Sequence, residues 1–304
     1  MTNITYDSKT DILRNKLCDF FKEFEYCEND AEYLLWAYDK IMSDPDARKL
    51  LDDTIAIYEA DYHCNYNDIW ANADKIAGIV YLNEYTVEFL TYVCLTNQLK
   101  KYYIANNISL DIYMTTVYDL KYKLEECKLV YGIIGTFVIE WYPKIFELRC
   151  FGIGRLQFQI VSMPQDYEKD GRKIAEGDKV IAVHIPRSGE PITEEACMAS
   201  YLAAKEFFKN TVIYDPCPFV CNTYLLFPEN ETFIPKNTNT YRFLKSYDVF
   251  RVEIDRHRKN LWRLFDTYEQ DLDKLPTDTS MRRAFVEHLK KGGKMGWGYG
   301  VRFV

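Results

Sequence analysis

The chain has 304 residues and a formal net charge of −8 at neutral pH, which is long enough for two domains of ordinary size. The charge is unevenly spread, with −10 over residues 1–130 and +2 over residues 131–304. An acidic first half beside a nearly neutral second half argues against nucleic acid as the main partner.

Nine cysteines and four histidines are scattered along the chain. An odd number of cysteines at irregular spacing does not make a disulfide framework, and histidines far apart in sequence do not predict a metal site. Residues 1–16 lack the apolar core of a signal peptide, and no run of about 18 apolar residues predicts a membrane span. We therefore expect a cytoplasmic protein that uses no metal and no membrane.

Apolar residues recur every three or four positions from Asp11 to about Cys127, in a stretch with almost no proline. This spacing predicts amphipathic helices. Pro45 suits the first turn of one helix, where its missing N–H costs nothing, and Ser109 is a good N-cap for the last one. Six helices with short connections predict an all-α domain over residues 1–130, in which nothing points to catalysis.

Near Val130 the period of the apolar pattern changes from about 3.6 to 2. Alternation predicts an antiparallel meander, followed by a polar loop at residues 164–178 and then by strand and helix patterns in turn. The segments that predict strands are 137–141, 146–150, 156–160, 180–185, 219–227 and 249–254, with a last one after a glycine-flanked loop. We therefore predict an α+β fold, with a mixed-sheet domain over residues 131–304.

The stretch from Gly177 to Asn210 predicts the centre of that domain. Its β-branched run after Lys179 is typical of a strand covered on both faces, and Thr193 is a good N-cap for the helix that follows. A strand that leads through a loop to a helix N-terminus is a frequent anion site, although most such units are plain connections. The helix residues predicted to face the sheet are Ala196, Ala199 and Ala203, with Cys197 and Phe208 buried beside them.

Four segments of the second half carry a resemblance to a known family. They read VHIPRSGEPITEEACMASYLAAKEFF, FVCNTYLLFPE, FIPKNTNTYRF and LPTDTSMRRAFVEHLKKGGKMGWGYG. In this order they resemble a family of bacterial N-acyltransferases that joins a helical N-terminal domain to a GNAT-like C-terminal domain. The resemblance covers most of residues 131–304. It implies acyl transfer from acyl-CoA, such as acetyl-CoA, to an amine of a small molecule or peptide.

The resemblance also implies where CoA would bind. GNAT enzymes carry a Q/R-x-x-G-x-G/A loop whose main-chain N–H groups cradle the diphosphate of acyl-CoA. Here residues 185–192 hold one glycine, two prolines and the carboxylate of Glu190, so the pattern departs from the family's cradle. The residues left to bind CoA are Arg187, Ser188, Gly189 and Thr193.

Four residues are candidates for the chemistry. His184, at the end of the central strand, and Glu140 are candidate general bases toward the amine. Tyr224 is a candidate acid that protonates the departing thiolate, and Cys221 is a candidate nucleophile beside His184. Each has a structural alternative, because a histidine at a strand end is often only hydrogen-bonded and a cysteine in a strand is often a small core residue.

Two other functions stay open. One is a GNAT-shaped non-catalytic ligand-binding or regulatory protein that lacks a working CoA cradle, and the other is a hydrolase built on Cys221. The basic stretch at residues 256–259 predicts a surface turn, and that at residues 282–294 predicts the capped end of a helix, with phosphate binding as the alternative for each.

Overall fold

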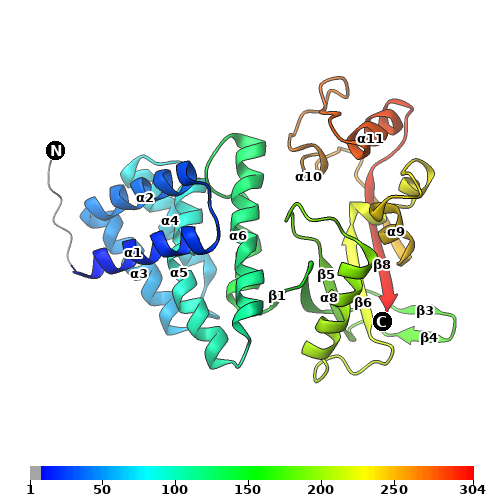
Figure 1. The fold of residues 1–304 in the computed structure, drawn as a ribbon, viewed down its shortest axis with the longest axis horizontal. Coiled ribbons are helices and arrows are strands. Elements are labelled where there is room, and N and C mark those ends of the chain that lie inside the picture. Colours follow the sequence, from blue (N-terminus) through cyan, green and yellow to red (C-terminus); the bar gives the residue numbers. More distant parts are fainter. Residues whose placement is uncertain (1–7) are drawn as a thin grey trace. The chain divides into compact units, whose positions relative to one another are not determined.

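The structure is a computed structural model that describes residues 8–304, with side chains from residue 12 onward. The chain forms two compact units, a first that ends at Arg149 and a second that runs from Cys150 to Val304 (Figure 1). Our expectation that the chain starts without a signal peptide rests partly on residues 1–7, which lie outside the described residues.

The first unit is a helical bundle, as the apolar spacing predicts. Asp44 caps the helix that starts at Pro45, accepting from the main-chain N–H of Ala47 (3.0 Å). The side chain of Ser109 caps the last long helix by accepting from the N–H of Ile112 (3.3 Å). The long helices are α1 (Ser8–Glu23), α2 (Glu28–Ser43), α3 (Pro45–Ala60), α4 (Tyr66–Val80), α5 (Glu84–Ala105) and α6 (Leu110–Tyr131).

Residues 131–149 also belong to the first unit, whereas we predicted a boundary near residue 130. They form the short helices η1 (Ile139–Trp141) and α7 (Tyr142–Phe146) in place of the first predicted strand. The second predicted strand, residues 146–150, is wrong except for Cys150, where β1 begins. The indole N–H of Trp141 donates to the buried carboxylate of Asp119 (2.9 Å), and Tyr58 donates to the carbonyl of Phe146 (2.9 Å). The alternating pattern of this segment therefore comes from aromatic side chains that pack on helices, not from a strand.

The second unit is built on a six-stranded mixed sheet with strand order β1-β2-β5-β6-β8-β7. Among the described strands, β5 and β6 pair in parallel, and their neighbours pair antiparallel. This confirms the predicted α+β fold with a GNAT-like mixed sheet. The sheet strands are β1 (Cys150–Ile153), β2 (Leu156–Ser162), β5 (Lys179–His184), β6 (Pro218–Thr223), β7 (Asp248–Ile254) and β8 (Gly296–Phe303).

The predicted loop at residues 164–178 contains a separate hairpin, β3 (Tyr167–Lys169) with β4 (Arg172–Ile174). Tyr167 and Ile174 are buried against Val180, Val220 and Val301 on one face of the sheet. Polar residues dominate the segment because only one residue of each short strand is buried. The loop prediction is therefore wrong for these six residues.

Helix α8 (Glu194–Phe207) covers the opposite face of the sheet. Its Tyr201 ring packs against Phe219 (4.9 Å) and Phe158 (6.1 Å), and Cys197 and Phe208 are buried as predicted. The predicted small-residue face is wrong, because Ala199 and Ala203 are exposed and Ala196 is half-buried. The tyrosine and its neighbours bury more apolar area than an alanine stripe would, and this sets the rotation of the helix.

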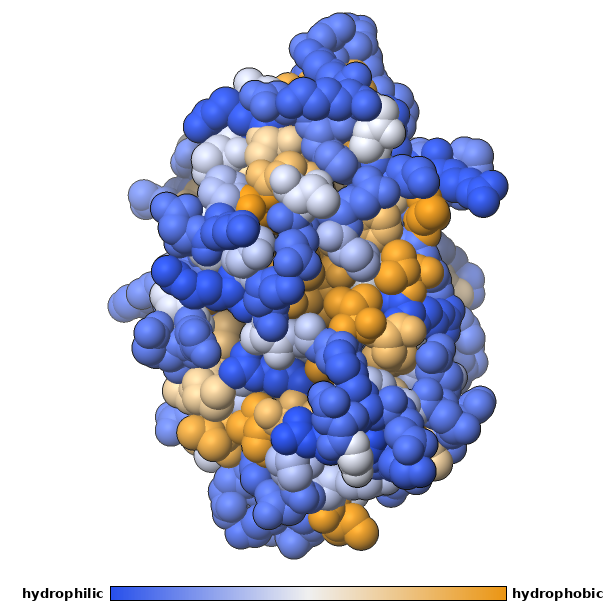
Figure 2. Space-filling model, turned by 90° about the vertical axis from the view of Figure 1, so that its right-hand side faces the viewer, coloured by the Kyte–Doolittle hydropathy of each residue, from blue (hydrophilic) through white to orange (hydrophobic). Residues whose placement is uncertain are grey.

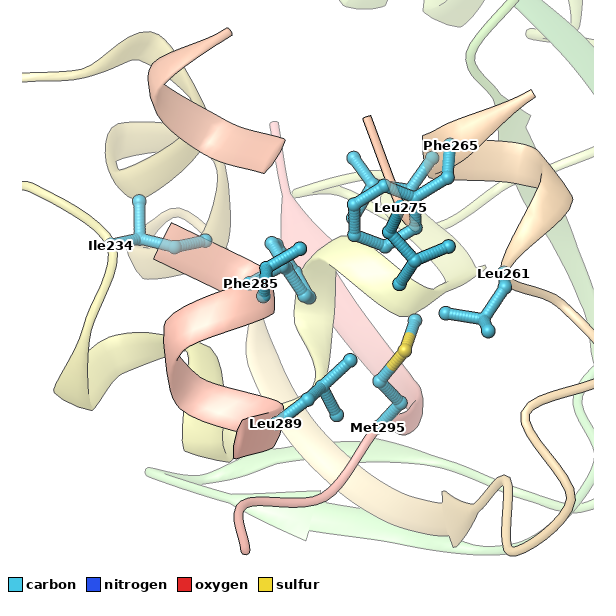
Figure 3. Packing of buried hydrophobic residues seen from close by; sticks show 9 residues of the cluster. Ile234, Leu261, Phe265, Leu275, Phe285, Leu289 and Met295 are labelled. Carbon is cyan, nitrogen blue, oxygen red and sulfur yellow. The ribbon is translucent and has the colours of Figure 1, made fainter. Parts of the chain in front are cut away.

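Apart from strand β7, the chain between β6 and β8 forms a helical layer, and its α10 and α11 lie beyond the carboxyl ends of β5 and β6 in Figure 1. The elements of this layer are η2 (Tyr224–Leu226), η3 (Pro228–Thr232), α9 (Asn239–Lys245), α10 (Trp262–Phe265) and α11 (Ser280–Lys290). Its own core contains Ile234, Leu261, Leu264, Phe265, Leu275, Phe285, Val286, Leu289 and Met295. Figure 3 shows Phe285 and Leu289 of α11 pointing into this core.

The predicted strand at residues 219–227 ends early, at Thr223. The Thr223 hydroxyl caps η2 by accepting from the N–H of Leu225 (3.3 Å). Asn230 then donates from its side chain to the carbonyls of Tyr224 (2.7 Å) and Leu225 (3.2 Å). These side-chain bonds replace the strand ladder, so Tyr224 lies just past the strand rather than on it.

The glycine-flanked loop predicted before the last strand is itself part of β8, which begins at Gly296. Gly296, Gly298 and Gly300 share one face of this strand, since side chains alternate along it. A Cβ at Gly298 would lie closer to the carbonyl oxygen of Leu226 than van der Waals contact allows. The glycines therefore allow η2 to lie directly on the strand.

Candidate functional site

The two parallel strands at the centre of the sheet separate at their carboxyl ends. Their register pairs Ile181 with Phe219 and Ala182 with Val220. Beyond these pairs, β5 continues to His184 against β2, and β6 continues to Thr223 against β8. In open sheets of this kind, ligands bind outside the carboxyl ends of the strands, at the point where the strand order switches.

His184 is the last residue of β5 and is half-buried. The register places it directly opposite the buried Gln157 of β2, so both side chains leave the same face of the sheet. That face also carries Ala182, two residues earlier. Val183 and its partner Phe158 leave the other face, on which Phe158 packs against Tyr201 of α8. His184, Gln157 and Ala182 therefore lie on the face away from α8.

Cys221 lies on the other face of β6, since it alternates with Val220, which pairs with Ala182. His184 and Cys221 therefore leave opposite faces of the sheet, and the predicted Cys–His nucleophilic pair does not form. The Cys221 thiol is buried, donates to the carbonyl of Val183 (3.4 Å), and has a raised pKa because of this burial. A thiol held protonated in this way is a poor nucleophile.

The loop from residue 185 to Thr193 joins β5 to α8. Thr193 caps α8 as predicted, accepting from the N–H of Ala196 (3.2 Å). The Ser188 hydroxyl accepts from the N–H of Glu190 (3.3 Å), and Gly189 takes a positive φ of 80°, which a glycine adopts without strain. Ser188 and Gly189 thus shape the turn that leads to the helix N-terminus.

Arg155 holds this loop, and no sequence pattern identified it. Its guanidinium donates to the carbonyls of Pro186 (3.1 Å) and Glu190 (3.0 Å from Nε and 2.8 Å from Nη2). Its main-chain N–H donates to the Ser200 hydroxyl on α8 (2.8 Å). Arg155 belongs to the turn between β1 and β2, far from the loop in sequence, and it acts on main-chain carbonyls, which no side-chain motif records.

Arg187, predicted to serve the helix N-terminus, is held by a carboxylate of another element. Its guanidinium forms a two-bond ion pair with the carboxylate of Asp266, at the end of α10, with an Nη2–Oδ2 distance of 2.8 Å. Arg282 of α11 binds the same carboxylate. Burial alone would raise the pKa of Asp266, but the hydrogen bonds and charges of the two arginines outweigh it and hold this pKa below its ordinary value.

Tyr224 lies beside this ion-pair network. Its ring is edge-on to those of Phe285 and Trp297, each at 6.4 Å. Burial raises the pKa of Tyr224 to about 12, although nearby arginines, Arg187 first among them, act in the opposite direction. The hydroxyl is therefore protonated at neutral pH and can act as a proton donor. Tyr224 and Arg187 lie close together in the structure. The sequence analysis assigned Tyr224 to the chemistry and Arg187 to CoA binding.

Glu140 does not lie on the sheet. It is exposed in η1 of the first unit, so the prediction that places it on a strand is wrong. Its charge acts on Glu88 of α5, a half-buried carboxyl group. Burial first, then the charges of Asp74, Glu84 and Glu140, raise the pKa of Glu88 to about 8.

Residues 8–304 hold neither a metal-binding cluster nor a membrane-spanning helix. No group of three or more His, Cys, Asp or Glu side chains there is placed to hold a metal ion, and no helix combines the length and apolar character needed to cross a membrane. In Figure 2 the viewed face is mostly hydrophilic, with apolar side chains gathered near its middle. In the same part of the chain, which includes all nine cysteines, none forms a disulfide.

Both halves of the chain match known domain families. Residues 15–148 match the N-acyltransferase N-terminal domain, and residues 150–302 match the GNAT-like C-terminal domain. The two matches meet at the division between the compact units. A comparison with curated proteins found no match.

The fold is similar to that of solved acyltransferases. An acyltransferase in complex with decanoyl-CoA and teicoplanin is 19% identical, with a TM-score of 0.72 over 94% of this chain and 87% of that one. A mutant acyltransferase in complex with octanoyl-CoA is 19% identical, with a TM-score of 0.72 over 98% and 94% of the two chains. A third complex, with CoA and 10C-teicoplanin, has a TM-score of 0.71 at 19% identity over 94% and 87%.

Proposed function

Because the chain belongs to the family that joins an N-acyltransferase N-terminal domain to a GNAT-like C-terminal domain, we propose that it transfers an acyl group from acyl-CoA to an amine. The observation that carries this proposal is the separation of β5 from β6 after Ala182 and Val220. Main-chain N–H groups at the end of β5 that do not bond to β2 can then face a thioester inserted between the strands. His184 and Tyr224 lie at the ends of the same two strands.

The N-terminus of α8 is the proposed site for the CoA diphosphate. The helix dipole and the N–H groups of its first turn, other than that of Ala196, which Thr193 caps, favour an anion there. Arg155 fixes the preceding loop through the carbonyls of Pro186 and Glu190, which compensates for the missing glycines of the family's cradle. We assign Ser188, Gly189 and Thr193 to this site, whereas Arg187 contributes through its ion pair with Asp266.

The two faces of the sheet suggest how the substrates approach. Helix α8 covers one face, so CoA bound at its N-terminus reaches the strand opening from that side. The acceptor amine then arrives on the opposite face, where His184 lies beside Gln157. In this arrangement the amine nitrogen and the thioester carbon meet in the opening between β5 and β6.

The reaction would proceed by direct transfer. His184 takes a proton from the amine, whose nitrogen lone pair forms a bond to the thioester carbonyl carbon. Main-chain N–H groups of β5 beyond Ala182 stabilise the negative charge that develops on the carbonyl oxygen. The carbon–sulfur bond then breaks, and Tyr224 gives its hydroxyl proton to the thiolate. The products are an N-acyl amide and CoA.

The proposal also covers the acyl donor, the acceptor and the cellular location. The similar solved structures contain decanoyl-CoA and octanoyl-CoA, so we include medium-chain acyl-CoA beside acetyl-CoA as the donor. The acceptor is a small-molecule amine. A reduced cytoplasm supplies acyl-CoA and fits the absence of disulfides among the described cysteines, and the resemblance to bacterial enzymes favours a bacterial source.

Release of the CoA thiol from acetyl-CoA and octanoyl-CoA, measured with a panel of amines, tests this function. We expect His184→Gln to lower kcat by about 100-fold or more, the usual effect of losing a general base, with little change in KM for acyl-CoA. His257→Gln, at an exposed histidine, is the control. Absence of thiol release with every donor and amine, together with absence of acyl-CoA binding by calorimetry, would favour the non-catalytic ligand-binding alternative.

A further inference from the structure

Gln157 carries a buried carboxamide close to the point where the central strands separate. It is the second residue of β2 and is 3% exposed. No residue in the described part of the chain forms a hydrogen bond with its side chain. A carboxamide has two N–H donors and an acceptor oxygen, and most buried polar side chains in folded proteins have partners. This exception indicates a group whose partner comes from outside the fold.

The strand register places this carboxamide beside the proposed general base. Gln157 pairs with His184 of β5 on one side and with Gly152 of β1 on the other. Gly152 brings no side chain to the face, and a strand glycine often marks the close approach of a ligand. Directly opposite residues have Cβ atoms about 4.5–5.5 Å apart. A substrate atom bonded to the His184 ring therefore lies within reach of the Gln157 carboxamide.

The proposed reaction needs a second acceptor at this place. A primary amine has two hydrogens on its nitrogen, and its lone pair forms the bond to the thioester carbon. His184 takes one hydrogen as a proton, and the other stays as the N–H of the product amide. Positive charge develops on the nitrogen as the carbon–nitrogen bond forms, so an oxygen that accepts from the remaining N–H stabilises the transition state more than the ground state.

We propose that Gln157 binds the acceptor amine, with its Oε1 accepting a hydrogen bond from the N–H that the product keeps. The inference rests on the proposed function. A secondary amine has a carbon in place of this hydrogen, so it would leave the buried carboxamide oxygen without a donor. A site built to bond to a substrate N–H rejects an analogue that lacks it. Gln157 therefore makes the chain selective for primary amines over N-methylated ones.

A matched pair of product amides tests this contact without turnover. N-hexyloctanamide keeps the N–H, whereas N-hexyl-N-methyloctanamide has a methyl group there. Calorimetry of the wild-type chain should show about fivefold tighter binding of N-hexyloctanamide, the size expected for one hydrogen bond. Gln157→Leu should remove this preference, and Gln157→Glu, which keeps an acceptor oxygen, should retain it. Gln159→Leu is the matched control, because Gln159 lies on the same strand and face but opposite Ala182, further from the opening.

Stability separates binding from a structural role. Gln157→Leu replaces an unpaired buried carboxamide by an apolar group, so the urea midpoint should stay the same or rise. A carboxamide that serves the fold would instead lower the midpoint when it is removed. A lower midpoint, with the preference between the two product amides unchanged, would overturn the inference.

Other outcomes would also contradict it. Equal affinity of the wild-type chain for the two product amides would do so, as would binding of neither. Asn222 of β6 shares the face of His184, because Val220 pairs with Ala182. If Asn222→Leu removed the preference and Gln157→Leu did not, Asn222 would hold the N–H from the other side of the opening, and the inference would be wrong.

A separate measurement keeps the inference and the proposed function distinguishable. Thiol release from octanoyl-CoA is followed with hexylamine and with N-methylhexylamine as acceptors. A ratio of their kcat/KM values that is the same in wild type and Gln157→Leu would refute the contact with Gln157 and support the acyltransferase. Gln157-dependent binding of N-hexyloctanamide without thiol release from any amine would support the contact and refute the proposed transfer.

Discussion

The thiol of Cys221 donates a hydrogen bond to the main-chain carbonyl of Val183, at 3.4 Å, where β5 and β6 separate. In a continuing parallel ladder this carbonyl would accept from a main-chain N–H of the neighbouring strand. A side chain of β6 supplies the donor instead, so the strands part without leaving a buried carbonyl unbonded. The cysteine therefore has a structural role at the opening on which the proposed function depends.

Replacement of Cys221 should affect stability more than turnover. Cys221→Ala removes the donor to a buried carbonyl and should lower the free energy of unfolding by about 1–3 kcal/mol, whereas Cys221→Ser keeps a donor and should cost less. Urea unfolding measures both. Thiol release should stay within a few-fold of wild type in each folded variant, and its complete loss in both would instead favour the hydrolase built on Cys221.

Arg155 should control acyl-CoA binding without taking part in the chemistry. Arg155→Ala removes the guanidinium bonds to Pro186 and Glu190, and we expect KM for acyl-CoA to rise about tenfold, as for loss of charged hydrogen bonds, with kcat nearly unchanged. Arg155→Lys should rescue little, because an ammonium group cannot reproduce the planar set of donors. An unchanged KM in both variants would mean that the loop does not hold CoA.

The carboxylate of Asp266 should stabilise the fold in a pH-dependent way. Its pKa in the folded protein is lowered, so its contribution is complete above the unfolded value of about 3.9 and is lost as the pH falls through the folded value. At pH 7, Asp266→Asn should lower the free energy of unfolding by roughly 2 kcal/mol, because two arginines lose a largely buried ionic partner. This difference should shrink below about pH 4.

Urea unfolding at pH 7 and at pH 3.5 measures this effect. Asp273→Asn is the control, because Asp273 forms an ion pair with Lys290 while its side chain is 83% exposed, and screened surface pairs contribute little. A difference between wild type and Asp266→Asn that is the same at both pH values would show that the ionised carboxylate is not what stabilises the network.

Alanine at Gly298 should destabilise the second unit strongly. The new Cβ would overlap the carbonyl oxygen of Leu226, and η2 would have to move off β8. We expect a loss of roughly 3 kcal/mol or more. Gly171→Ala is the matched control, since Gly171 has a positive φ of 76° but open space around it, and it should cost only about 1 kcal/mol. Similar effects at the two sites would contradict the close approach of η2.

Periodicity and capping residues predicted much of the fold. Ser109 and Thr193 both cap the helices that follow them, because an N-cap hydroxyl acts within a few residues and is visible in local sequence. The parallel strand after Lys179 was equally visible as a continuous β-branched run. These elements are specified by local sequence, so no tertiary contact had to be known.

The elements that were wrong depend on side-chain partners that lie outside the predicted segment. Residues 137–141 alternate like a strand, yet Trp141 is fixed by Asp119 of a distant helix. Tyr224 leaves its predicted strand because the Asn230 side chain takes over the main-chain bonding. Apolar alternation reports which side chains are buried, but not which surface buries them.

The site shows the same limit. The sequence pattern predicted His184 at the end of one strand and Tyr224 near the end of the next, and these two strands are the parallel pair. The direction of Arg187 depends on Asp266, 79 positions later, and the role of Arg155 depends on main-chain carbonyls. Neither relationship leaves a local spacing pattern, so both required the folded structure.

The position of β8 between β6 and β7 has a consequence for biosynthesis. Val220 of β6 pairs with Val301, and Asp248 of β7 pairs with the same residue from the other side. On the ribosome, the helical unit can form from contacts that are mostly near in sequence, but β6 and β7 have no common neighbour until β8 has been made. Until then the nascent chain exposes the edges of β6 and β7 that β8 later pairs with, which makes this interval the one in which it is most exposed to aggregation and most dependent on chaperones.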